Sequence, residues 1–208
     1  MKIAPVKTPV VAKKMFPNYV WDIATTSKEL YLTFDDGPTP EITNWTLDIL
    51  KKYNAKATFF CIGTNIKKHP DLFKNIIRDG HAVGNHTQNH IKGWKTNSID
   101  YVKEVEEAQR AINSKLNLFR PPYGQISPKQ GKKLIELGYQ IIMWDVLSFD
   151  WEKNISEEKC LENVISKSKA GSIIVFHDSV KASKNMMYAL PKVLEFFSEK
   201  GFVFKSLT

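Results

Sequence analysis

The sequence predicts a single α/β domain built on a parallel sheet or barrel. Three observations support this prediction. Short apolar runs rich in β-branched and aromatic residues alternate with amphipathic helical patterns, the alternation runs from about residue 29 to the end, and capping residues or glycines separate the segments. Strands that alternate with helices form parallel sheets, because each helix returns the chain to the same end of the sheet. A chain of 208 residues is long enough for one domain with a sizeable core.

Seven apolar runs are predicted to be strands. In chain order they cover residues 30–34, 57–62, 81–85, 117–120, 139–144, 172–177 and 202–206. Residues 1–28 lack this pattern and are predicted to form an irregular arm packed on the domain of residues 29–208. We find no internal repeat, low-complexity tract or interdomain linker.

Amphipathic helices are predicted between most of these strands. Three apolar stripes have helical spacing: Ile42, Trp45, Ile49, Leu50 and Tyr53; Leu72, Phe73, Ile76 and Ile77; and Ile99, Val102, Val105, Ile112 and Leu116. Ser127 with Gln130 predicts a capping box with Pro128 at the first helical position, and Ser156 before two glutamates predicts another helix start. Helix ends are predicted at Gly80, Gly138, Gly171 and Gly201.

The net charge of +8 favours anionic partners such as nucleic acid, a membrane surface or an anionic cell wall. The lysines are spread along the chain without a dense basic run interleaved with aromatic residues, so nucleic-acid binding is not predicted as a main role. Two cysteines, Cys61 and Cys160, cannot form a disulfide framework. Both lie in apolar surroundings and are predicted to be buried free thiols, with a single bridge as the alternative.

No apolar run is long enough to predict a transmembrane segment. The first residues contain no continuous apolar h-region and no clear cleavage site, so no signal peptide is predicted. Two localisations stay open: a cytoplasmic protein, or a trimmed or exported form that acts at the cell envelope. The sequence predicts no particular oligomeric state.

Ionisable side chains stand where the predicted strands end. They are Asp35 and Asp36 after the first strand, His86 and His90 after the third, Arg120 at the fourth, Asp145 and Asp150 after the fifth, and His177 and Asp178 at the sixth. In parallel α/β barrels the carboxyl ends of the strands and the loops that follow them build the active site. This set of residues therefore predicts an active site.

The segment HTQNH separates His86 and His90 by four positions. On one helical turn this spacing aims both imidazoles the same way, which suits a metal ion. An isolated pair of this kind is more often solvated surface, but an aspartate from another strand end completes a set of two histidines and one carboxylate that leaves room for water. One of the neighbouring Asp35 and Asp36 is therefore predicted to bind a divalent cation, whose charge makes the other acid tolerable beside it. Zn²⁺ is the first choice, and the same ligands accept Co²⁺, Ni²⁺ or Fe²⁺.

The remaining aspartate is predicted to act as a base toward a water molecule that the metal activates. Arg120 would keep this base ionised and oriented. His177 is a candidate general acid, and a carboxylate such as Asp150 would keep its imidazole protonated and correctly aimed. A base, an activated water and an acid together predict hydrolysis of a carbonyl compound. Each residue alone also has a structural explanation, such as a turn for the segment DDGP or a salt bridge for Arg120.

Five segments carry a resemblance to a known family. TFDDGP, HTQNH, RPPYG, SFDW and IIVFHDS occur in the order and approximate spacing of the five motifs of polysaccharide deacetylases, carbohydrate esterase family 4. The sequence resembles this family over about residues 29–206. The resemblance implies a distorted (β/α)7 barrel, with residues 29–208 as the catalytic domain, and metal-dependent removal of N- or O-acetyl groups from a polysaccharide such as peptidoglycan or a chitin-like oligomer.

The resemblance also assigns roles. It implies that Asp35 is the base, which Arg120 orients, and that Asp36 is the metal ligand beside His86 and His90. It implies that Asp150 tunes His177, the acid that protonates the leaving amine.

Substrate contacts follow from the same resemblance. The backbone N–H of Tyr123 would help to stabilise the oxyanion, and Trp151 and Val175 would line a pocket for the acetyl methyl group. Two positions depart from the family pattern. Members often carry leucine where Val175 stands, and many carry a further aspartate where Leu147 stands, so we expect a slightly wider methyl pocket and altered substrate contacts.

Two alternative functions stay open. The barrel could bind carbohydrate or cell wall without catalysis, although such a protein is expected to lose the base or a metal ligand. The same machinery could also hydrolyse a non-sugar amide or an O-acetyl ester. Outside the motifs, His69 and His81 are predicted to be structural or solvated. Trp45 and Trp144 are predicted to be core residues, and Trp94 is a candidate, with Trp151, for stacking on sugar rings.

Overall fold

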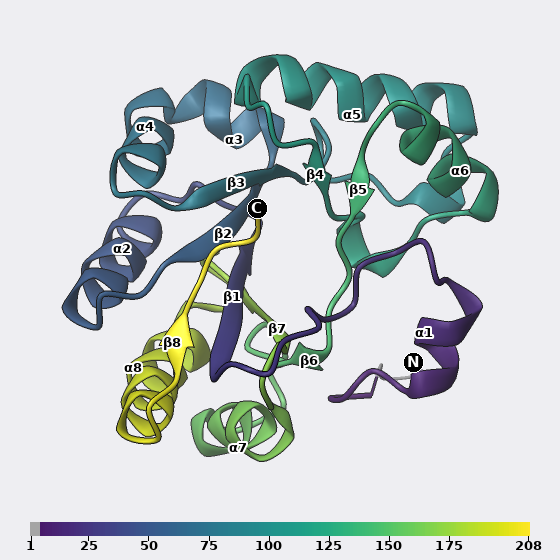
Figure 1. Ribbon diagram of the computed structural model, residues 1–208. Helices are drawn as coiled ribbons and strands as arrows, with labels where there is room; N and C mark the ends of the chain where they lie inside the picture. Colours follow the sequence, from purple (N-terminus) through teal and green to yellow (C-terminus); the bar gives the residue numbers. More distant parts are fainter. Residues whose placement is uncertain (1–4) are drawn as a thin grey trace.

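The computed structural model describes residues 5–208 as a curled parallel sheet with helices on its outer side (Figure 1). The hydrogen-bonded order of its strands is β5-β4-β3-β2-β1-β7-β6, with β8 paired to β1 outside this path. The bounds are β1 Glu29–Asp35, β2 Ala57–Cys61, β3 Ala82–Asn85, β4 Leu118–Phe119, β5 Gln140–Ile141, β6 Val146–Leu147, β7 Ile173–His177 and β8 Val203–Phe204. The expected distorted (β/α)7 barrel is confirmed. Its strand order begins at β5 and ends at β6, and these two strands do not pair with each other.

The seven barrel strands are not the seven predicted ones. β6 was missed, because two residues are too few to show a periodicity and they follow the predicted run of residues 139–144 closely. The predicted strand at residues 202–206 exists only as β8, which pairs with Glu29 and Leu30 at the start of β1 and does not belong to the barrel path. Each of the seven predicted runs therefore contains a strand, and the eighth strand of the sheet, β6, was not predicted.

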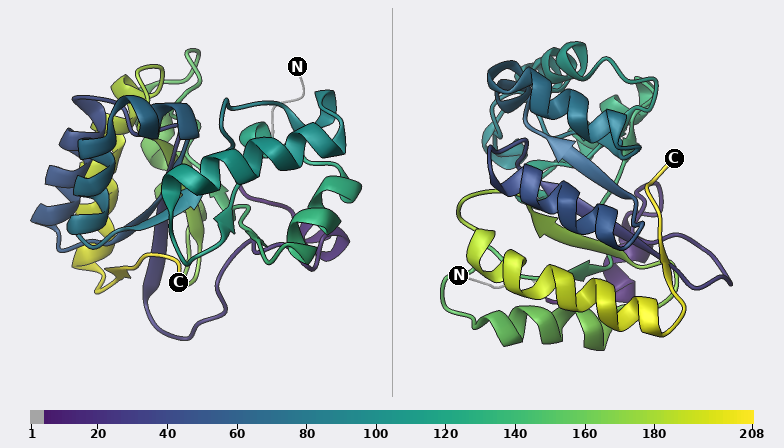
Figure 2. Two further views of the ribbon diagram at one scale, coloured as in Figure 1. Left: turned by 90° about the horizontal axis from the view of Figure 1, so that it is seen from above. Right: turned by 90° about the vertical axis from the view of Figure 1, so that its left-hand side faces the viewer.

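Helices cover the outside of the sheet in both views of Figure 2. Their bounds are α1 Val10–Met15, α2 Ile42–Lys52, α3 Gly63–Lys68, α4 Pro70–Arg78, α5 Ser98–Ile112, α6 Pro128–Glu136, α7 Glu157–Lys167 and α8 Ser183–Glu199, with 3-10 turns at Gly93–Lys95 and Pro122–Gly124. The capping box of Ser127 and Gln130 is present, and Ser156 caps α7 by accepting from the backbone N–H of Lys159. No helix of residues 5–208 is long and apolar enough to cross a membrane.

One predicted helix end was wrong. Gly80, Gly138 and Gly201 each follow a helix with positive φ, but α7 already ends at Lys167, before Gly171. Gly171 has φ +80° in the turn before β7, and a Cβ there would lie 1.9 Å from the carbonyl oxygen of Ile23. The glycine is therefore needed for a close approach of two chain segments and not for helix termination.

The main core lies between the sheet and its helices. The rings of Phe34, Phe59 and Phe176 stack across β2, β1 and β7, with centroid distances of 5.0 and 6.1 Å. All three are fully buried and belong to a cluster that includes side chains of α2 and α8. Cys61 and Cys160 are buried and unbridged, as predicted. Because this core is packed, the polar residues at the strand ends stand on a rigid platform.

Residues 5–28 run along the open side of the sheet. Isolated bridges join Val20 to Ile142 beside β5 and Lys7 to Val146 of β6. The buried carboxylate of Asp145 forms ion pairs with Lys7 and Lys13. Asp145 therefore anchors this segment and does not reach the candidate site. The segment was predicted to be irregular, but it contains the short helix α1.

Candidate active site

The carboxyl ends of the parallel strands bring the predicted residues together. Asp35 is the last residue of β1 and lies in register with His177, the last residue of β7. His86 directly follows β3, Arg120 directly follows β4, and Asp150 follows β6 after a short loop. Parallel strands place these ends at one edge of the sheet, so residues far apart in the sequence become neighbours.

A cleft of about 330 Å³ opens over these strand ends. Eight of the predicted residues line it: Asp35, Asp36, His86, His90, Tyr123, Trp151, Val175 and His177. The other two, Arg120 and Asp150, are fully buried behind the lining residues, and each hydrogen-bonds one of them. The volume is in the range of a small-ligand site, large enough for one sugar residue with its acetyl group.

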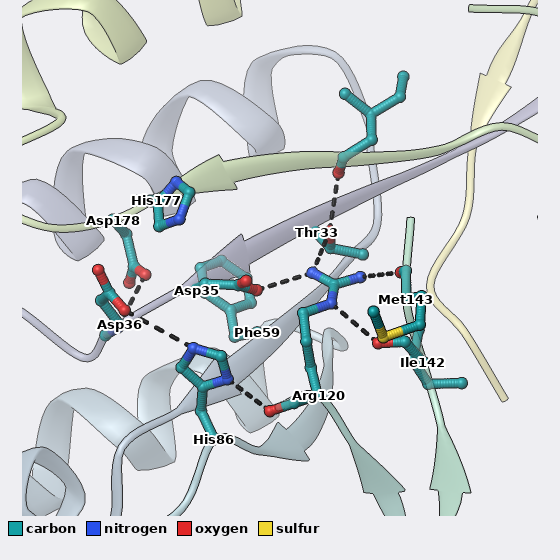
Figure 3. A network of polar contacts seen from close by, with 12 residues as sticks. Thr33, Asp35, Asp36, Phe59, His86, Arg120, Ile142, Met143, His177 and Asp178 are labelled. Carbon is teal, nitrogen blue, oxygen red and sulfur yellow. Dashed lines mark hydrogen bonds and ion pairs between the residues drawn. The ribbon is translucent and has the colours of Figure 1, made fainter. Parts of the chain in front are cut away.

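Asp36, His86 and His90 form a cluster that fits a metal ion. Their ligand atoms all lie within 4.8 Å of one another. Asp36 Oδ1 is 3.7 Å from His86 Nε2 and 3.2 Å from His90 Nε2. Two ligands at about 2 Å from a tetrahedral zinc ion are separated by roughly 3.3 Å, so little movement is needed to bind one. Figure 3 shows His86 pointing toward Asp36.

The two histidines do not share a helical turn, as their spacing had suggested. Residues 86–90 form a loop after β3, in which Thr87 and His90 have φ of 64° and 55°. Thr87 N–H donates to Asn85 Oδ1 at 2.9 Å, which holds the chain in this turn. Both imidazoles still reach Asp36. The two left-handed residues of the loop bring them together, and no helical turn is needed.

The hydrogen bonding of Asp36 and the protonation of His86 also suit a cation. Asp36 Oδ1 is enclosed and accepts no well-formed hydrogen bond from residues 5–208. His86 Nδ1 lies 2.7 Å from the carbonyl oxygen of Arg120 and so carries the proton, which leaves the Nε2 lone pair directed at Asp36. Burial lowers the pKa of His86 to about 4, so its imidazole is neutral at physiological pH. A buried acceptor without a partner beside a neutral imidazole is the environment a divalent metal ion requires.

Asp35 and Arg120 form a buried ion pair. Arg120 Nη1 donates to Asp35 Oδ1 at 2.7 Å, and the arginine side chain has no solvent exposure. The guanidinium also donates to Thr33 Oγ1 and to the carbonyl oxygens of Ile142 and Met143, as Figure 3 shows. Its position is thereby fixed by four acceptors. The Asp35 carboxylate is held in one orientation, with one edge facing the cleft.

His177 is held by Asp150 on the opposite side of the cleft. The ring Nδ1 of His177 lies 2.8 Å from Asp150 Oδ1, and its backbone N–H donates to Asp150 Oδ2 at 2.6 Å. Burial alone would lower the pKa of His177, but the charge and hydrogen bond of Asp150, with the charges of Asp36 and Asp35, raise the pKa to about 9. The imidazolium is therefore the dominant form near neutral pH, ready to donate a proton.

An apolar wall completes the cleft. Val175 and Leu147 are buried beside each other on β7 and β6, and the indole of Trp151 stacks on Phe149 with ring centroids 5.0 Å apart. The edge of Trp151 also meets the His177 ring at 4.7 Å. A small apolar group of a substrate would fit against this wall, next to the proton donor.

Sequence reasoning missed part of the lining. Pro121, Gly124, Trp144 and Lys181 also face the cleft, as does Leu147, where altered substrate contacts were expected. Trp144 was predicted to be a core residue, yet its indole lies against Gly124, where an added Cβ would come within 2.5 Å of the ring. The available signal was its place as the last residue of the predicted strand of residues 139–144, directly before Asp145. Trp94, considered for sugar stacking, is exposed outside the cleft and donates its indole N–H to the carbonyl oxygen of Ile126.

A carboxylate paired with an arginine, an imidazole paired with a carboxylate and a cluster that fits a metal ion, all around one cleft, are typical of a class of protein, the metal-dependent hydrolases. Asp35 and His177 end neighbouring strands, and Asp36, His86 and His90 line the same cleft.

Comparison with known proteins specifies the class. Residues 22–142 match the profile of the polysaccharide deacetylase family. A peptidoglycan-N-acetylglucosamine deacetylase of Bacillus cereus is 32% identical over 193 residues, which cover 90% of each chain. Chitin deacetylase 2 of Saccharomyces cerevisiae is 32% identical over 83% of this chain, and the match spans 57% of the yeast protein.

A solved structure supports the same assignment. A peptidoglycan N-acetylglucosamine deacetylase bound to 4-naphthalen-1-yl-N-oxidanyl-benzamide superimposes with a TM-score of 0.88 and 34% identity, over 96% of this chain and 95% of that chain. The chain belongs to the polysaccharide deacetylase family, a family of metal-dependent hydrolases. The resemblance found in the five sequence motifs is thereby confirmed.

Proposed function

We propose that this protein removes the acetyl group from N-acetylglucosamine residues of peptidoglycan, with Zn²⁺ held by Asp36, His86 and His90. The observation that carries the proposal is the placement of a buried Asp35–Arg120 pair and a buried Asp150–His177 pair on either side of one candidate metal site. The relatives described above are named for deacetylation of peptidoglycan or chitin, both of which contain N-acetylglucosamine.

Each residue has one task in the proposed reaction. The bound metal ion would supply Lewis-acid polarisation of the acetyl carbonyl and activation of the attacking water. Asp35 takes a proton from that water as the new carbon–oxygen bond forms. Arg120 holds the Asp35 carboxylate in place, so no reorganisation is needed at that moment. His177 gives its proton to the amide nitrogen as the carbon–nitrogen bond breaks, and acetate and a free amine leave.

The substrate is oriented by the remaining lining residues. Val175, Leu147 and Trp151 receive the acetyl methyl group, which places the carbonyl carbon between the base and the acid. The backbone N–H of Tyr123 supports the negative charge that develops on the carbonyl oxygen. The ring of Tyr123 packs on His90 at 4.6 Å and offers a flat face for a sugar ring.

Two ammonium groups at the mouth of the cleft favour an anionic glycan. Lys181 lines the cleft, and Lys92 Nζ lies 4.8 Å from the centre of the Tyr123 ring. Peptidoglycan carries carboxylates on its peptides, and on lactyl groups to which no peptide is attached, whereas chitin is neutral. We therefore expect peptidoglycan fragments to be deacetylated with a lower KM than uncharged N-acetylglucosamine oligomers, and this preference should weaken at high salt.

Acetate release tests the proposal. Metal-stripped protein should release no acetate from N-acetylglucosamine oligomers or peptidoglycan fragments, and restored Zn²⁺ should return the activity. Co²⁺ and Ni²⁺ are tested in parallel to identify the best metal. No release from either glycan despite measured metal occupancy would overturn the proposal. Release from an O-acetyl ester or a non-sugar amide would then indicate another acyl substrate, and sugar binding without release would indicate a non-catalytic barrel.

A further inference from the structure

Asp178 has a buried carboxyl group that the proposed mechanism does not use. It follows His177 at the end of β7, has no solvent exposure, and lies beside Asp36 in Figure 3. Burying one acid next to another costs free energy unless hydrogen bonds offset the cost. The groups that donate hydrogen bonds to Asp178 show which part of the chain it holds.

Asp178 holds the chain directly after Asp36. Its Oδ1 accepts from the backbone N–H of Gly37 at 3.1 Å, and its own backbone N–H donates to the carbonyl oxygen of Asp35 at 3.1 Å. A Cβ on Gly37 would lie only 2.0 Å from Asp178 Oδ2. The carboxyl group of Asp178 therefore occupies the space in which any other residue at position 37 would carry its side chain.

Thr43 extends this contact to the first turn of α2. Its hydroxyl donates to Asp178 Oδ2 at 2.5 Å and accepts from the backbone N–H of Thr39 at 2.8 Å. Thr43 is fully buried. The segment of residues 36–39 is thus bound to the end of β7 at Gly37 and to α2 at Thr39, through one continuous chain of hydrogen bonds.

Asp36 needs such support because its backbone is strained. It has φ 81°, a conformation that side-chain-bearing residues rarely adopt and that persists only where the surroundings determine it. Two further hydrogen bonds hold the same place: Asn65 Nδ2 donates to the carbonyl oxygen of Asp36 at 2.8 Å, and the backbone N–H of Ile62 donates to that of Gly37 at 3.0 Å. The conformation directs the Asp36 carboxylate toward His86 and His90.

We propose that Asp178 and Thr43 are positioning residues that hold Asp36 in the conformation required to bind the metal ion. The inference rests on the metal site proposed above and assigns a role to two residues outside it. Groups that orient metal ligands commonly change metal affinity when they are removed. Because Asp178 also adjoins His177, the same contact sets the spacing between the metal ligand and the proton donor.

Metal affinity, measured without substrate, tests the inference. Zn²⁺ dissociation constants are obtained by competition with a chromophoric chelator for the wild-type protein and for Thr43→Val, Thr43→Ser and Asp178→Asn. Thr46→Val is the matched control, because Thr46 is equally buried on α2 and its hydroxyl donates to the carbonyl oxygen of Ile42 and contacts Met186 Sδ at 4.0 Å, away from Asp36 and Asp178. The visible spectrum of the Co²⁺-loaded proteins reports the geometry of the site, and urea unfolding of the metal-free proteins reports stability.

We expect Thr43→Val to weaken Zn²⁺ binding by about 10–100-fold and to change the Co²⁺ spectrum. Thr43→Ser retains the hydroxyl and should restore both, and Thr46→Val should match the wild type. Asp178→Asn keeps the size of the side chain but replaces one of its two accepting oxygens with an NH2 group, which cannot accept from Gly37 or Thr43. This variant should therefore weaken Zn²⁺ binding. It provides the test if Thr43→Val does not fold. Unchanged affinity and spectrum in both Thr43→Val and Asp178→Asn would overturn the inference alone. Failure of the wild type to bind metal would overturn the proposed function and the inference with it.

Discussion

Asp150 receives two hydrogen bonds from His177, one from the ring Nδ1 at 2.8 Å and one from the backbone N–H at 2.6 Å. The carboxylate therefore determines both the direction of the imidazole and its charge. One oxygen fixes the main chain at the end of β7, and the other fixes the tautomer, so that Nε2 faces the cleft with a proton. In the proposed mechanism the proton donor is thus positioned before substrate binds.

Replacement of Asp150 by Asn should move the alkaline limit of activity. The pKa of His177 is raised to about 9 mainly by Asp150, so wild-type kcat/KM should fall only as the pH rises through this value. Without the carboxylate, burial lowers the pKa of His177, and kcat/KM should already fall above about pH 6.5. The measurement is kcat/KM against pH. Asp48→Asn removes an exposed acid on α2 as a control, and an alkaline limit that does not move in Asp150→Asn contradicts the assignment of His177 as the acid.

Asp35→Asn should abolish turnover while metal binding persists. The amide cannot accept the proton of the attacking water, and a positioned general base contributes about 10²–10⁴-fold to rate. Asp36, His86 and His90 are unchanged, so Zn²⁺ occupancy should remain. Single-turnover acetate release and metal content are measured on the same sample. Activity close to that of the wild type would show that another group is the base.

Removal of Arg120 should destabilise the fold through the charge that it leaves behind. Arg120→Met strands the buried carboxylate of Asp35, a change that typically costs about 3–5 kcal/mol. The double variant Arg120→Met with Asp35→Asn should recover part of the loss, because the stranded charge is gone. The measurement is urea unfolding of the wild type and of both variants.

Arg78 provides the matched control for this comparison. Its ion pair with Asp79 is exposed, with a distance of 3.3 Å, so Arg78→Met should change the free energy of unfolding by less than about 1 kcal/mol. Equal effects at Arg78 and Arg120 would mean that burial of the Arg120 pair is not what makes it important.

His81 should make the protein less stable in acid. Its Nδ1 accepts from the backbone N–H of Ala57 at 3.2 Å, and burial, with the charge of Lys56, lowers its pKa to about 4. In the unfolded chain His81 takes up a proton near pH 6.5, whereas in the folded protein it does so only near pH 4. Its contribution to stability is therefore complete above pH 6.5 and is lost as the pH falls from 6.5 to 4, by on the order of 2 kcal/mol.

Unfolding free energies of the wild type and His81→Asn, measured between pH 7 and 4, check this expectation. The Asn side-chain oxygen can accept the bond from Ala57 but does not titrate in this range. The difference between the two proteins should shrink or reverse as the pH falls, and parallel curves would rule out His81 as the source. Other acid-sensitive groups are common to both proteins and cancel in the difference.

The sequence by itself determined the class of fold and the kind of chemistry. Apolar runs ending in Asp35, Arg120 and His177 predicted where the site would be, because the carboxyl ends of parallel strands must meet. The pair of Asp35 and Asp36 predicted a cation, because two neighbouring carboxylates repel each other unless a positive charge lies beside them. These are local patterns, and hydrophobic periodicity and charge make them visible along the sequence.

Only the tertiary structure decided the contacts that make the site work. HTQNH has the spacing of a helical turn, yet it is a loop. Thr87 and His90 have left-handed backbone conformations, and the Thr87 N–H donates to the Asn85 side chain and not to a helical carbonyl. β6 is two residues long and is held by pairing with β7 and by the bridge from Lys7 to Val146. The bond from Thr43 to Asp178 joins residues 135 positions apart. No periodicity signals such contacts, because their energy comes from groups that become neighbours only after the sheet has formed.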